Sequence, residues 1–386
     1  MSTSFKAGMS IVVALIAGCG GGGGTQSSTP AAPVVAPPAP APAAPIAVLS
    51  SSYQNFKNIG LSQQSLPASV RNTLARGYAD FAQRGVVDLF TATQTYSPTT
   101  STPATATPSE FAFWRKQADG SYVKDTALLS ENTGCIHPRK AVIADFNNDG
   151  RPDVFVACHG YDALPFPGER SKIVLSQPNG TYAIKDASPD VGFFHGATAA
   201  DLNGDGWVDL IVVNNFDAAS AIVMLNKGDG TFVREQAPRL PAAIRNKPYF
   251  SVELVDINED GKLDLLLGGH EFDGAATVAL INPGNNDFSS VTPVILPAVA
   301  NEGVALDFTL TGTGASRAIW VLRTSGGDGT FYQSRVVQKI MWPTLASTVP
   351  LNKRPAQWVA WLIPTTVGGQ NAVASDDAAA GLSITY

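Results

Sequence analysis

The sequence predicts an all-β fold, a β-propeller made of four-stranded blades. An Asp-rich loop begins at Asp145, Asp201 and Asp256, about 55 residues apart, and such periods are typical of propellers and solenoids. Short apolar runs flank each loop, and a second turn with an aromatic residue recurs later in each unit. Four strands in one such unit form a propeller blade.

Each repeat has a constant order of elements. The loops read DFNNDGRPD, DLNGDGWVD and DINEDGKLD, and they are followed by the runs VFVA (154–157), LIVV (210–213) and LLLG (265–268). Short apolar runs bounded by turn formers indicate buried strands. Later turns, such as GDGTFV at Gly228 and GDGTFY at Gly327, are predicted to be hairpins. A unit is therefore strand, Asp-rich loop, strand, longer loop, strand, tight turn and strand.

The number of blades follows from weaker copies of the loop. Residues 80–88 keep two Asp and the Gly, residues 309–317 keep only the Gly, and a last copy near Pro364 keeps only its apolar flanks. We therefore expect six blades, or seven if the divergent C-terminal region holds another.

Ring closure is predicted from a second internal match. LPASVRN (66–72) matches LPAAIRN (240–246), which lies between the fourth strand of one blade and the first strand of the next. By analogy, residues 53–59 form a fourth strand with no blade of their own, whereas the C-terminal unit supplies three strands. We expect this N-terminal strand to complete the last blade, which would close the ring and hide its edges.

The N-terminal residues, 1–18, have the features of a secretory signal peptide. Lys6 is their only charge, and the apolar run 11–17 is too short to span a membrane. The run ends in Ile-Ala-Gly-Cys, which resembles the lipobox of bacterial lipoproteins. That resemblance implies that Cys19 is lipidated, and the Gly20 that follows resembles the pattern of lipoproteins sent to the outer membrane. An ordinary signal peptide with an accidental Cys is the alternative.

A tether precedes the folded domain. Residues 19–45 hold five consecutive glycines and then a Pro/Ala-rich run, which favours an extended polyproline II conformation. The propeller is expected over residues 46–386.

Two further cysteines, Cys135 and Cys158, fall just before one predicted strand and just after the neighbouring strand, so they can meet. An exported compartment permits a disulfide, which in the chain-entropy model stabilises the fold by roughly 3 kcal/mol. Two free buried thiols are the alternative.

The Asp-rich loops have the donor pattern of a metal site. Numbered from the first Asp, side-chain oxygens stand at positions 1, 3, 5 and 9, Gly at position 6 permits a sharp turn, and the carbonyl of position 7 can point the same way. Calcium favours such a flexible, all-oxygen donor set. Position 12, where an EF-hand has a bidentate Glu, is Val156, Val212 or Leu267, so the final Asp would take that role. Three hydrophilic turns without metal are the alternative, although close carboxylates then repel by up to about 4 kcal/mol per pair.

These loops, with the turn from Asn226 to Phe232, resemble the FG-GAP/VCBS repeats of bacterial surface proteins and of the integrin α propeller. The resemblance covers roughly residues 70–335 and implies about three structural calcium ions. The loop at Asp80 departs from the pattern, because Arg84 puts a positive charge where a ligand would be. The implied side-chain ligands are Asp145, Asn147, Asp149 and Asp153; Asp201, Asn203, Asp205 and Asp209; and Asp256, Asn258, Asp260 and Asp264, with backbone carbonyls from Arg151, Trp207 and Lys262.

A second candidate site lies at the opposite ends of the strands, where all four histidines are expected. A ring of His, Asn and Asp around a propeller axis would form a polar pocket for a sugar, a peptide or a transition metal. Side chains that only cap strand ends are the alternative. The residues of this face are His137, His159, Asp162, His195, Asn215, Asp217, His270 and Asp273.

Charge and motifs narrow the function classes. A formal net charge of -6 without any basic run argues against nucleic acid as a partner. No G-x-S-x-G, H-E-x-x-H or Gly-rich phosphate loop is present. We therefore expect a calcium-stabilised, lipid-anchored outer-membrane protein, facing periplasm or exterior, that binds a carbohydrate or protein partner and is not an enzyme. A propeller enzyme acting on polysaccharide and a scaffold subunit of an envelope complex are the alternatives.

Overall fold

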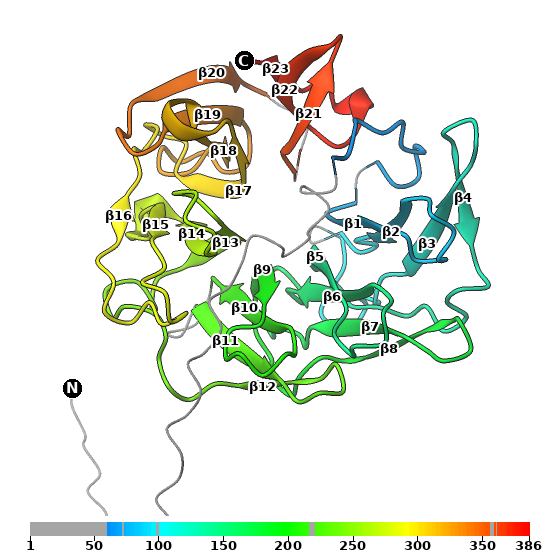
Figure 1. Cartoon of the computed structure of the whole chain (residues 1–386). Helices are drawn as coiled ribbons and strands as arrows, with labels where there is room; N and C mark the ends of the chain where they lie inside the picture. Colours follow the sequence, from blue (N-terminus) through cyan, green and yellow to red (C-terminus); the bar gives the residue numbers. More distant parts are fainter. Residues whose placement is uncertain (1–59, 72, 98–99, 216–220, 356–358, 360) are drawn as a thin grey trace, which may run out of the picture. The chain divides into compact units, whose positions relative to one another are not determined.

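The computed structural model describes residues 60–386 except 72, 98–99, 216–220, 356–358 and 360. Within them the strands form six antiparallel sheets, set as blades around a ring (Figure 1). The predicted all-β propeller with six blades is thus confirmed. None of the described helices is long and apolar enough to cross a membrane. Helical structure in this part of the chain is limited to the short 3-10 turns η2 (Glu271–Asp273), η3 (Gly314–Ser316) and η4 (Ala378–Ala380).

The first five blades have four strands each, paired in chain order. Blade one consists of β1 (Ala75–Ala79), β2 (Asp88–Ala92), β3 (Phe111–Lys116) and β4 (Tyr122–Asp125), and blade two of β5 (Pro138–Ala144), β6 (Asp153–Cys158), β7 (Lys172–Ser176) and β8 (Tyr182–Asp186). Blade three consists of β9 (Phe194–Ala200), β10 (Asp209–Asn214), β11 (Ala221–Asn226) and β12 (Phe232–Arg234), and blade four of β13 (Tyr249–Val255), β14 (Asp264–Gly269), β15 (Val278–Leu280) and β16 (Val294–Ile295). Blade five consists of β17 (Val304–Thr311), β18 (Ala318–Thr324), β19 (Arg335–Met341) and β20 (Ser347–Lys353).

Blade six has three described strands, as expected for the C-terminal unit: β21 (Ile363–Val367), β22 (Gln370–Ala374) and β23 (Ser383–Thr385). Gly368 and Gly369 form the turn between the first two, with φ of 58° and 81°. Positive φ at both central residues is what a type I′ hairpin turn requires, and Gly adopts it without steric strain.

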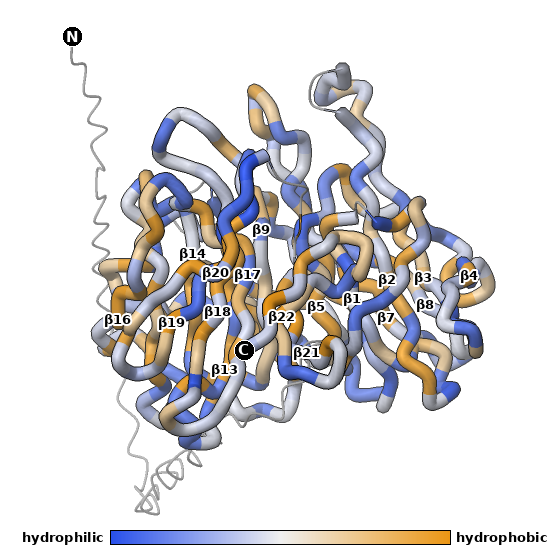
Figure 2. The backbone as a smooth tube through the Cα atoms, turned by 90° about the horizontal axis from the view of Figure 1, so that it is seen from above, coloured by the Kyte–Doolittle hydropathy of each residue, from blue (hydrophilic) through white to orange (hydrophobic). Residues whose placement is uncertain are grey.

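Apolar clusters fill the interfaces between blades. In β10, Leu210 and Val212 pack in the cluster shared with blade two, whereas Ile211 and Val213 pack in the cluster shared with blade four. One such cluster lies at each of the six blade interfaces. Figure 2 shows the apolar residues concentrated along the strands and the polar residues in the loops. A strand buried on both faces has no polar face, which is why these strands read as continuous apolar runs.

Cys135 and Cys158 form the predicted disulfide, with their Cα atoms 6.1 Å apart. Cys135 lies just before β5 and Cys158 is the last residue of β6, and both are fully buried. The bond therefore joins the segments that enter and leave the first strand pair of blade two.

Blade five departs from the predicted repeat. The loop expected at residues 309–317 is wrong in its bounds, because β17 continues to Thr311 and only residues 312–317 connect it to β18. The turn at Gly327 joins the second and third strands, not the third and fourth as its sequence suggested. The copy expected near Pro364 is likewise wrong only in where it starts, since Pro364 pairs within β21 and the connection to β22 is the turn at Gly368 and Gly369. Residues 309–317 and the stretch near Pro364 lack the Asp residues that end the strand pairing in blades two to four. In blade five, β17 and β18 therefore stay paired up to Thr311 and Ala318.

The ring closes where the N-terminal segment reaches blade six. The predicted closing strand, residues 53–59, lies outside the described residues. The segment that follows it runs along blade six, where Gln64 forms a parallel bridge with Asp377 and donates its backbone N–H to the carbonyl of Asp376 at 2.7 Å.

A buried ion pair joins blade one to blade six beside this segment. Arg76 of β1 contacts Asp376 through two hydrogen bonds, Nε to Oδ2 at 2.8 Å and Nη2 to Oδ1 at 2.7 Å, although the residues are 300 positions apart. Tyr78 donates its hydroxyl to the same carboxylate at 2.9 Å. All three side chains are buried. The carboxylate of Asp376 is therefore the acceptor on which the closure of the ring depends.

We expect Asp376→Asn to destabilise the fold by roughly 3–5 kcal/mol, because it leaves the Arg76 guanidinium buried without a counter-charge. The free energy of unfolding in urea measures this. Arg170→Ala is the matched control, since the side chains of Arg170 and its partner Asp186 are 50% and 42% exposed; exposed pairs contribute about 0–1 kcal/mol. Equal losses in the two variants would contradict a closing role for the Arg76 pair.

Candidate functional site

The first Asp of each Asp-rich loop shapes its turn. Asp145, between β5 and β6, accepts the backbone N–H of Asp149 on Oδ1 at 3.0 Å and that of Gly150 on Oδ2 at 2.8 Å. Asp201 and Asp256 accept the equivalent N–H groups in blades three and four. Gly150 adopts φ of 83°, which explains the Gly at position 6.

The last Asp of each loop has a structural role that the sequence did not reveal. Asp209 accepts the N–H of Leu202 on Oδ2 at 2.9 Å and the N–H of Asn226 on Oδ1 at 2.8 Å, so it ties the loop to the third strand of its blade. Asp153 and Asp264 make the same two contacts in their blades, and all three carboxylates are fully buried. Burial raises the pKa of each of the three carboxyls to about 6, and the backbone N–H donations oppose that rise.

The donor set of these loops fits calcium in its chemistry. Positions 1, 3 and 5 offer carboxylate and amide oxygens near the surface, and hard oxygen ligands on a flexible loop suit this ion. In blade two Asp149 accepts the hydroxyl of Ser176 at 2.5 Å, and in blade four Asp260 pairs with Lys262 at 2.9 Å. A bound calcium ion would supply to each loop the positive charge that Lys262 now supplies in blade four, and the ligands predicted from the sequence would hold it.

Blade one carries an arginine in the equivalent loop. Asp80 accepts the N–H groups of Arg84 and Gly85, as the first Asp does in the other loops. The Arg84 guanidinium donates to Asp88 Oδ1 at 2.6 Å. The positive charge of Arg84 thus lies against Asp88, the last carboxylate of this loop. The sequence analysis placed this charge at a ligand position of the loop.

The histidines meet at the centre of the ring, at the opposite ends of the same strands. The ring centroids of His137 and His159 lie 5.0 Å apart, those of His159 and His195 4.5 Å, and Phe250 stands 4.4 Å from His195 and 5.9 Å from His270. The first strands of successive blades contact each other, which brings these residues together. The predicted gathering of His137, His159, His195 and His270 is therefore observed, whereas Asp217 lies outside the described residues.

The hydrogen bonds assign a neutral tautomer to three of the imidazoles. Arg139 Nη1 donates to His137 Nε2 at 3.2 Å, so His137 carries its proton on Nδ1, where it meets the Tyr96 hydroxyl at 3.1 Å. His159 Nδ1 lies 3.2 Å from the Gly160 carbonyl, and His195 Nδ1 lies 3.0 Å from the Phe193 carbonyl, so both donate from Nδ1. His195 Nε2 is 3.3 Å from the amide nitrogen of Asn215 and accepts from it.

Burial and one guanidinium keep these imidazoles neutral. Desolvation lowers the pKa of all four histidines, and the charge of Arg139 lowers each of them further. The pKa of His159 falls to about 3. Each imidazole therefore keeps an unprotonated nitrogen at physiological pH.

Charged side chains complete the centre. Arg139 stacks on Phe250, with its guanidinium carbon 4.8 Å from the ring centroid. Lys140 Nζ lies 2.5 Å from a carboxylate oxygen of Glu253, which joins blade two to blade four. A cavity of about 30 Å³ lies beside them, lined by Leu74, Arg139, Lys140, His195, Phe250, Ser251, Leu306 and Trp361.

Exposed aromatic rings lie at the rim of this centre, and the sequence did not predict them as site residues. Phe272, Phe331 and Tyr332, called here the aromatic platform, are 37%, 47% and 44% exposed. Phe272 stacks on His270 at 5.0 Å and meets Phe331 edge-on at 5.4 Å. Asp273 lies 3.7 Å from His270 Nδ1 and is exposed. Two platform residues follow Gly327, whose turn the sequence placed at the wrong end of the blade.

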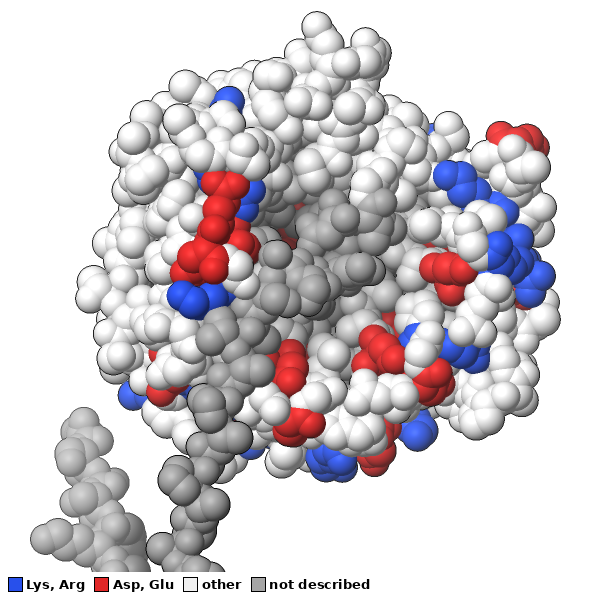
Figure 3. Space-filling model, viewed as in Figure 1, with Lys and Arg blue, Asp and Glu red and all other residues white. Residues whose placement is uncertain are grey.

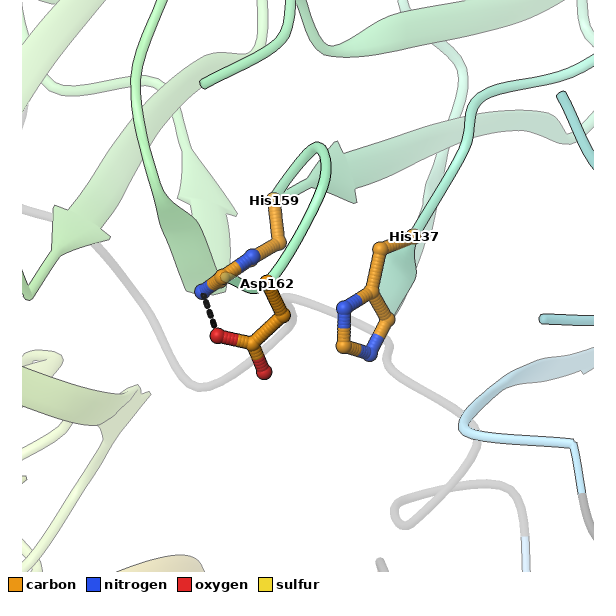
Figure 4. Close-up of side chains that lie close together, drawn as sticks. All are labelled: His137, His159 and Asp162. Atoms are coloured by element: carbon orange, nitrogen blue, oxygen red, sulfur yellow. Dashed lines mark ion pairs between the residues drawn. The ribbon is translucent and has the colours of Figure 1, made fainter. Parts of the chain in front are cut away.

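Polar groups of blade two form a compact cluster on the same face. His137, His159 and Asp162 each put one potential ligand atom within 4.8 Å of the other two, and in the described part of the chain this is the one set of three His, Cys, Asp or Glu that does so. Figure 4 shows the Asp162 carboxylate between the two imidazole rings.

Surface charge is mixed on the face drawn in Figure 3. Lys and Arg lie there in small groups next to Asp and Glu, without a continuous basic surface.

Comparison with known proteins gives a family match for part of the chain and distantly similar solved structures. The FG-GAP-like repeat family matches residues 201–267, which hold the Asp-rich loop of blade three and the first two strands of blade four. No curated protein matches the chain. Among solved structures, a putative 6-phosphogluconolactonase from Bacteroides uniformis is similar at 10% identity, with 82% of this chain and 80% of that chain covered and a TM-score of 0.48.

Two further structures have a comparable sequence identity. A putative 6-phosphogluconolactonase from Bacteroides fragilis has 11% identity over 88% of this chain and 92% of that chain, with a TM-score of 0.47. The xylan beta-1,4-xylosidase of Bacillus halodurans has 10% identity over 80% and 82%, with a TM-score of 0.33. Similarity at this level says nothing about activity.

The fold and its repeated loops define a six-bladed β-propeller. The type of repeat follows from two observations. Asp-rich loops join the first and second strands of the blades, and a family model matches residues 201–267. The chain is a β-propeller that carries an FG-GAP-like repeat at residues 201–267.

Proposed function

We propose that this protein is a carbohydrate-binding propeller of the bacterial cell envelope, anchored by lipid and stiffened by calcium. The aromatic platform beside His270 and Asp273 is the observation that carries the binding role. Neighbouring exposed aromatic rings on a protein surface commonly mark a binding site. Such rings pack against the apolar C–H face of a sugar, while a nearby imidazole and carboxylate can bond its hydroxyl groups.

The chemistry at the centre favours binding over turnover. In the described residues, the imidazoles hydrogen-bond to Tyr96, Arg139, Asn215, Tyr332 and backbone carbonyls, and no Ser or Cys bonds to one. A nucleophile activated by an adjacent imidazole would require such a contact. A polysaccharide-active enzyme is the alternative, and analysis of the sugar after incubation distinguishes it.

Binding is tested with a panel of neutral and acidic oligosaccharides. We expect Tyr332→Ala and Phe331→Ala to weaken binding of a glycan recognised by the wild-type protein by at least about tenfold, because each removes a stacking surface. Tyr386→Ala is the control, since Tyr386 is also 44% exposed but lies beside Trp320, away from the platform. Isothermal titration calorimetry gives the dissociation constants. Absence of glycan binding, or an equal loss in the control, would contradict the proposal, and capture of a protein instead would favour a scaffold role.

The disulfide and the leader support the envelope location. The Cys135–Cys158 bond is of a kind that persists in oxidising compartments. Cys19, the predicted lipidation site, lies outside the described residues. We expect incorporation of a labelled fatty acid by the wild-type protein and its loss in Cys19→Ser. Labelling that survives this substitution would rule out Cys19 as the lipidation site, and an unlabelled wild type would rule out the anchor.

Calcium is proposed to stiffen blades two, three and four. We expect calcium to raise the melting temperature of the protein above its value in chelator, because the ion neutralises carboxylates held on one loop. Asp205→Ala should lower this rise and reduce the bound calcium by about one ion per chain. Asp229→Ala, an exposed Asp in the turn between β11 and β12, is the control and should change neither quantity.

Asp209→Ala should behave differently from Asp205→Ala. It removes the buried acceptor of two backbone N–H groups, so it should lower stability even in chelator, by about 1–3 kcal/mol for each unpaired group. A normal calcium response in Asp205→Ala would disprove the ligand assignment, while a loss confined to calcium buffer in Asp209→Ala would disprove its structural role.

A further inference from the structure

We propose that His137, His159 and Asp162 form a binding site for a single transition-metal ion, with zinc(II) as the best match to two imidazoles and one carboxylate. This site lies on blade two and shares no residue with the Asp-rich loops or the aromatic platform. It stands independently of the proposed carbohydrate and calcium binding, because it rests on different residues.

The strongest indication is that two acceptor atoms face each other. His159 donates from Nδ1 to the Gly160 carbonyl, so its Nε2 holds a lone pair, and this nitrogen lies 3.8 Å from Asp162 Oδ1 (Figure 4). Two acceptors without a proton between them repel, whereas a cation between them attracts both. Ligands bound to zinc at about 2.0–2.1 Å in a tetrahedron lie about 3.4 Å apart, which is close to the observed spacing.

The hydrogen bond at the far nitrogen of His159 is also typical of a metal ligand. A ligating imidazole generally donates its other N–H to a carbonyl or a carboxylate, which fixes the tautomer and the ring orientation. Gly160 supplies that carbonyl here. This hydrogen bond already holds the His159 ring in the orientation that metal binding through Nε2 would need.

The two imidazole-bearing segments are held together by covalent and backbone bonds. Cys135, two residues before His137, is bonded to Cys158, the residue directly before His159. The N–H of His159 also donates to the carbonyl of His137 at 2.9 Å. Both imidazoles are buried, whereas the Asp162 side chain is 41% exposed and provides a route from solvent. A preorganised pair with one accessible third ligand leaves a coordination position open for water or for a donor atom of a ligand.

Arg139 is the feature that limits metal affinity. Its guanidinium donates to His137 Nε2 at 3.2 Å, and its charge lowers the pKa of Asp162 against the rise that burial causes, so it already stabilises the carboxylate that a metal ion would bind. A divalent ion would have to displace the bond to His137 and approach a like charge. Removing the guanidinium should therefore tighten metal binding, while removing a ligand should weaken it.

The test is zinc titration of the purified, chelator-treated protein in saturating calcium, so that the Asp-rich loops do not compete. We expect one zinc ion per chain by calorimetry and elemental analysis, and a dissociation constant at least about tenfold weaker in His159→Gln and in Asp162→Asn. His270→Gln is the matched control, because His270 also has an Asp three residues later at 3.7 Å but, in the described part of the chain, no third His, Cys, Asp or Glu close to both. It should bind zinc as the wild type does.

Arg139→Met keeps the proposal testable even where a ligand variant fails to fold. This change retains an apolar stem over Phe250, and we expect it to bind zinc at least about tenfold more tightly, because a competing charge is gone. No zinc bound by the wild type, equal loss in His270→Gln, or unchanged affinity in both Arg139→Met and His159→Gln would overturn the proposal. A protein that binds zinc but not calcium would contradict the calcium proposal and would still support the zinc site.

Discussion

Closure of the ring is the constraint on which the other features depend. An open edge at blade one or blade six would expose the apolar cluster between them, and the first strands would lose their fixed spacing around the centre. Arg76, Tyr78 and Asp376 close the ring with charges removed from water, and such a pair stabilises only when its geometry is good and its remaining polar atoms are bonded. The bidentate contact and the Tyr78 hydroxyl satisfy those conditions. The imidazoles of blades two, three and four meet at the centre because this closure holds their strands in place.

In blades two to four, the first two strands have different roles at their two ends. At the loop end, a buried carboxylate such as Asp209 ties loop to sheet with two backbone hydrogen bonds and needs no ion to do so. At the other end, Arg139, His195 and Phe250 occupy one equivalent place in three successive blades, six residues before the first Asp of the loop. The Asp-rich loop is thus the same in the three blades, whereas the equivalent residue at the centre of the ring differs. A cationic, an imidazole and an aromatic side chain therefore meet there.

The strands beside the Asp-rich loops could be predicted from sequence because burial on both faces makes them continuous apolar runs. Blade five could not, since the turn at Gly327 has the residues of an outer hairpin but stands between the second and third strands. Turn residues specify a local conformation and leave open which two strands the turn connects. Phe331 and Tyr332 were missed for this reason. Tyr96 was missed because it reaches His137 from blade one, 41 residues away, and no local pattern marks such a contact.

The centre of the ring is where the sequence departs most from what stability alone requires. Apolar clusters fill every blade interface, and well-packed apolar residues in place of buried charges are often equally or more stable. The centre instead holds four imidazoles, the Arg139 guanidinium and the buried pair of Lys140 and Glu253. Burial and the single guanidinium keep the imidazoles neutral, and a neutral imidazole retains the lone pair with which it can bind a ligand or an ion. Asp162 and Asp273 stand exposed at the edge of this group, where both carboxylates are accessible from solvent. Local departures from the most stable packing concentrate at functional sites, and in this propeller they concentrate at the centre.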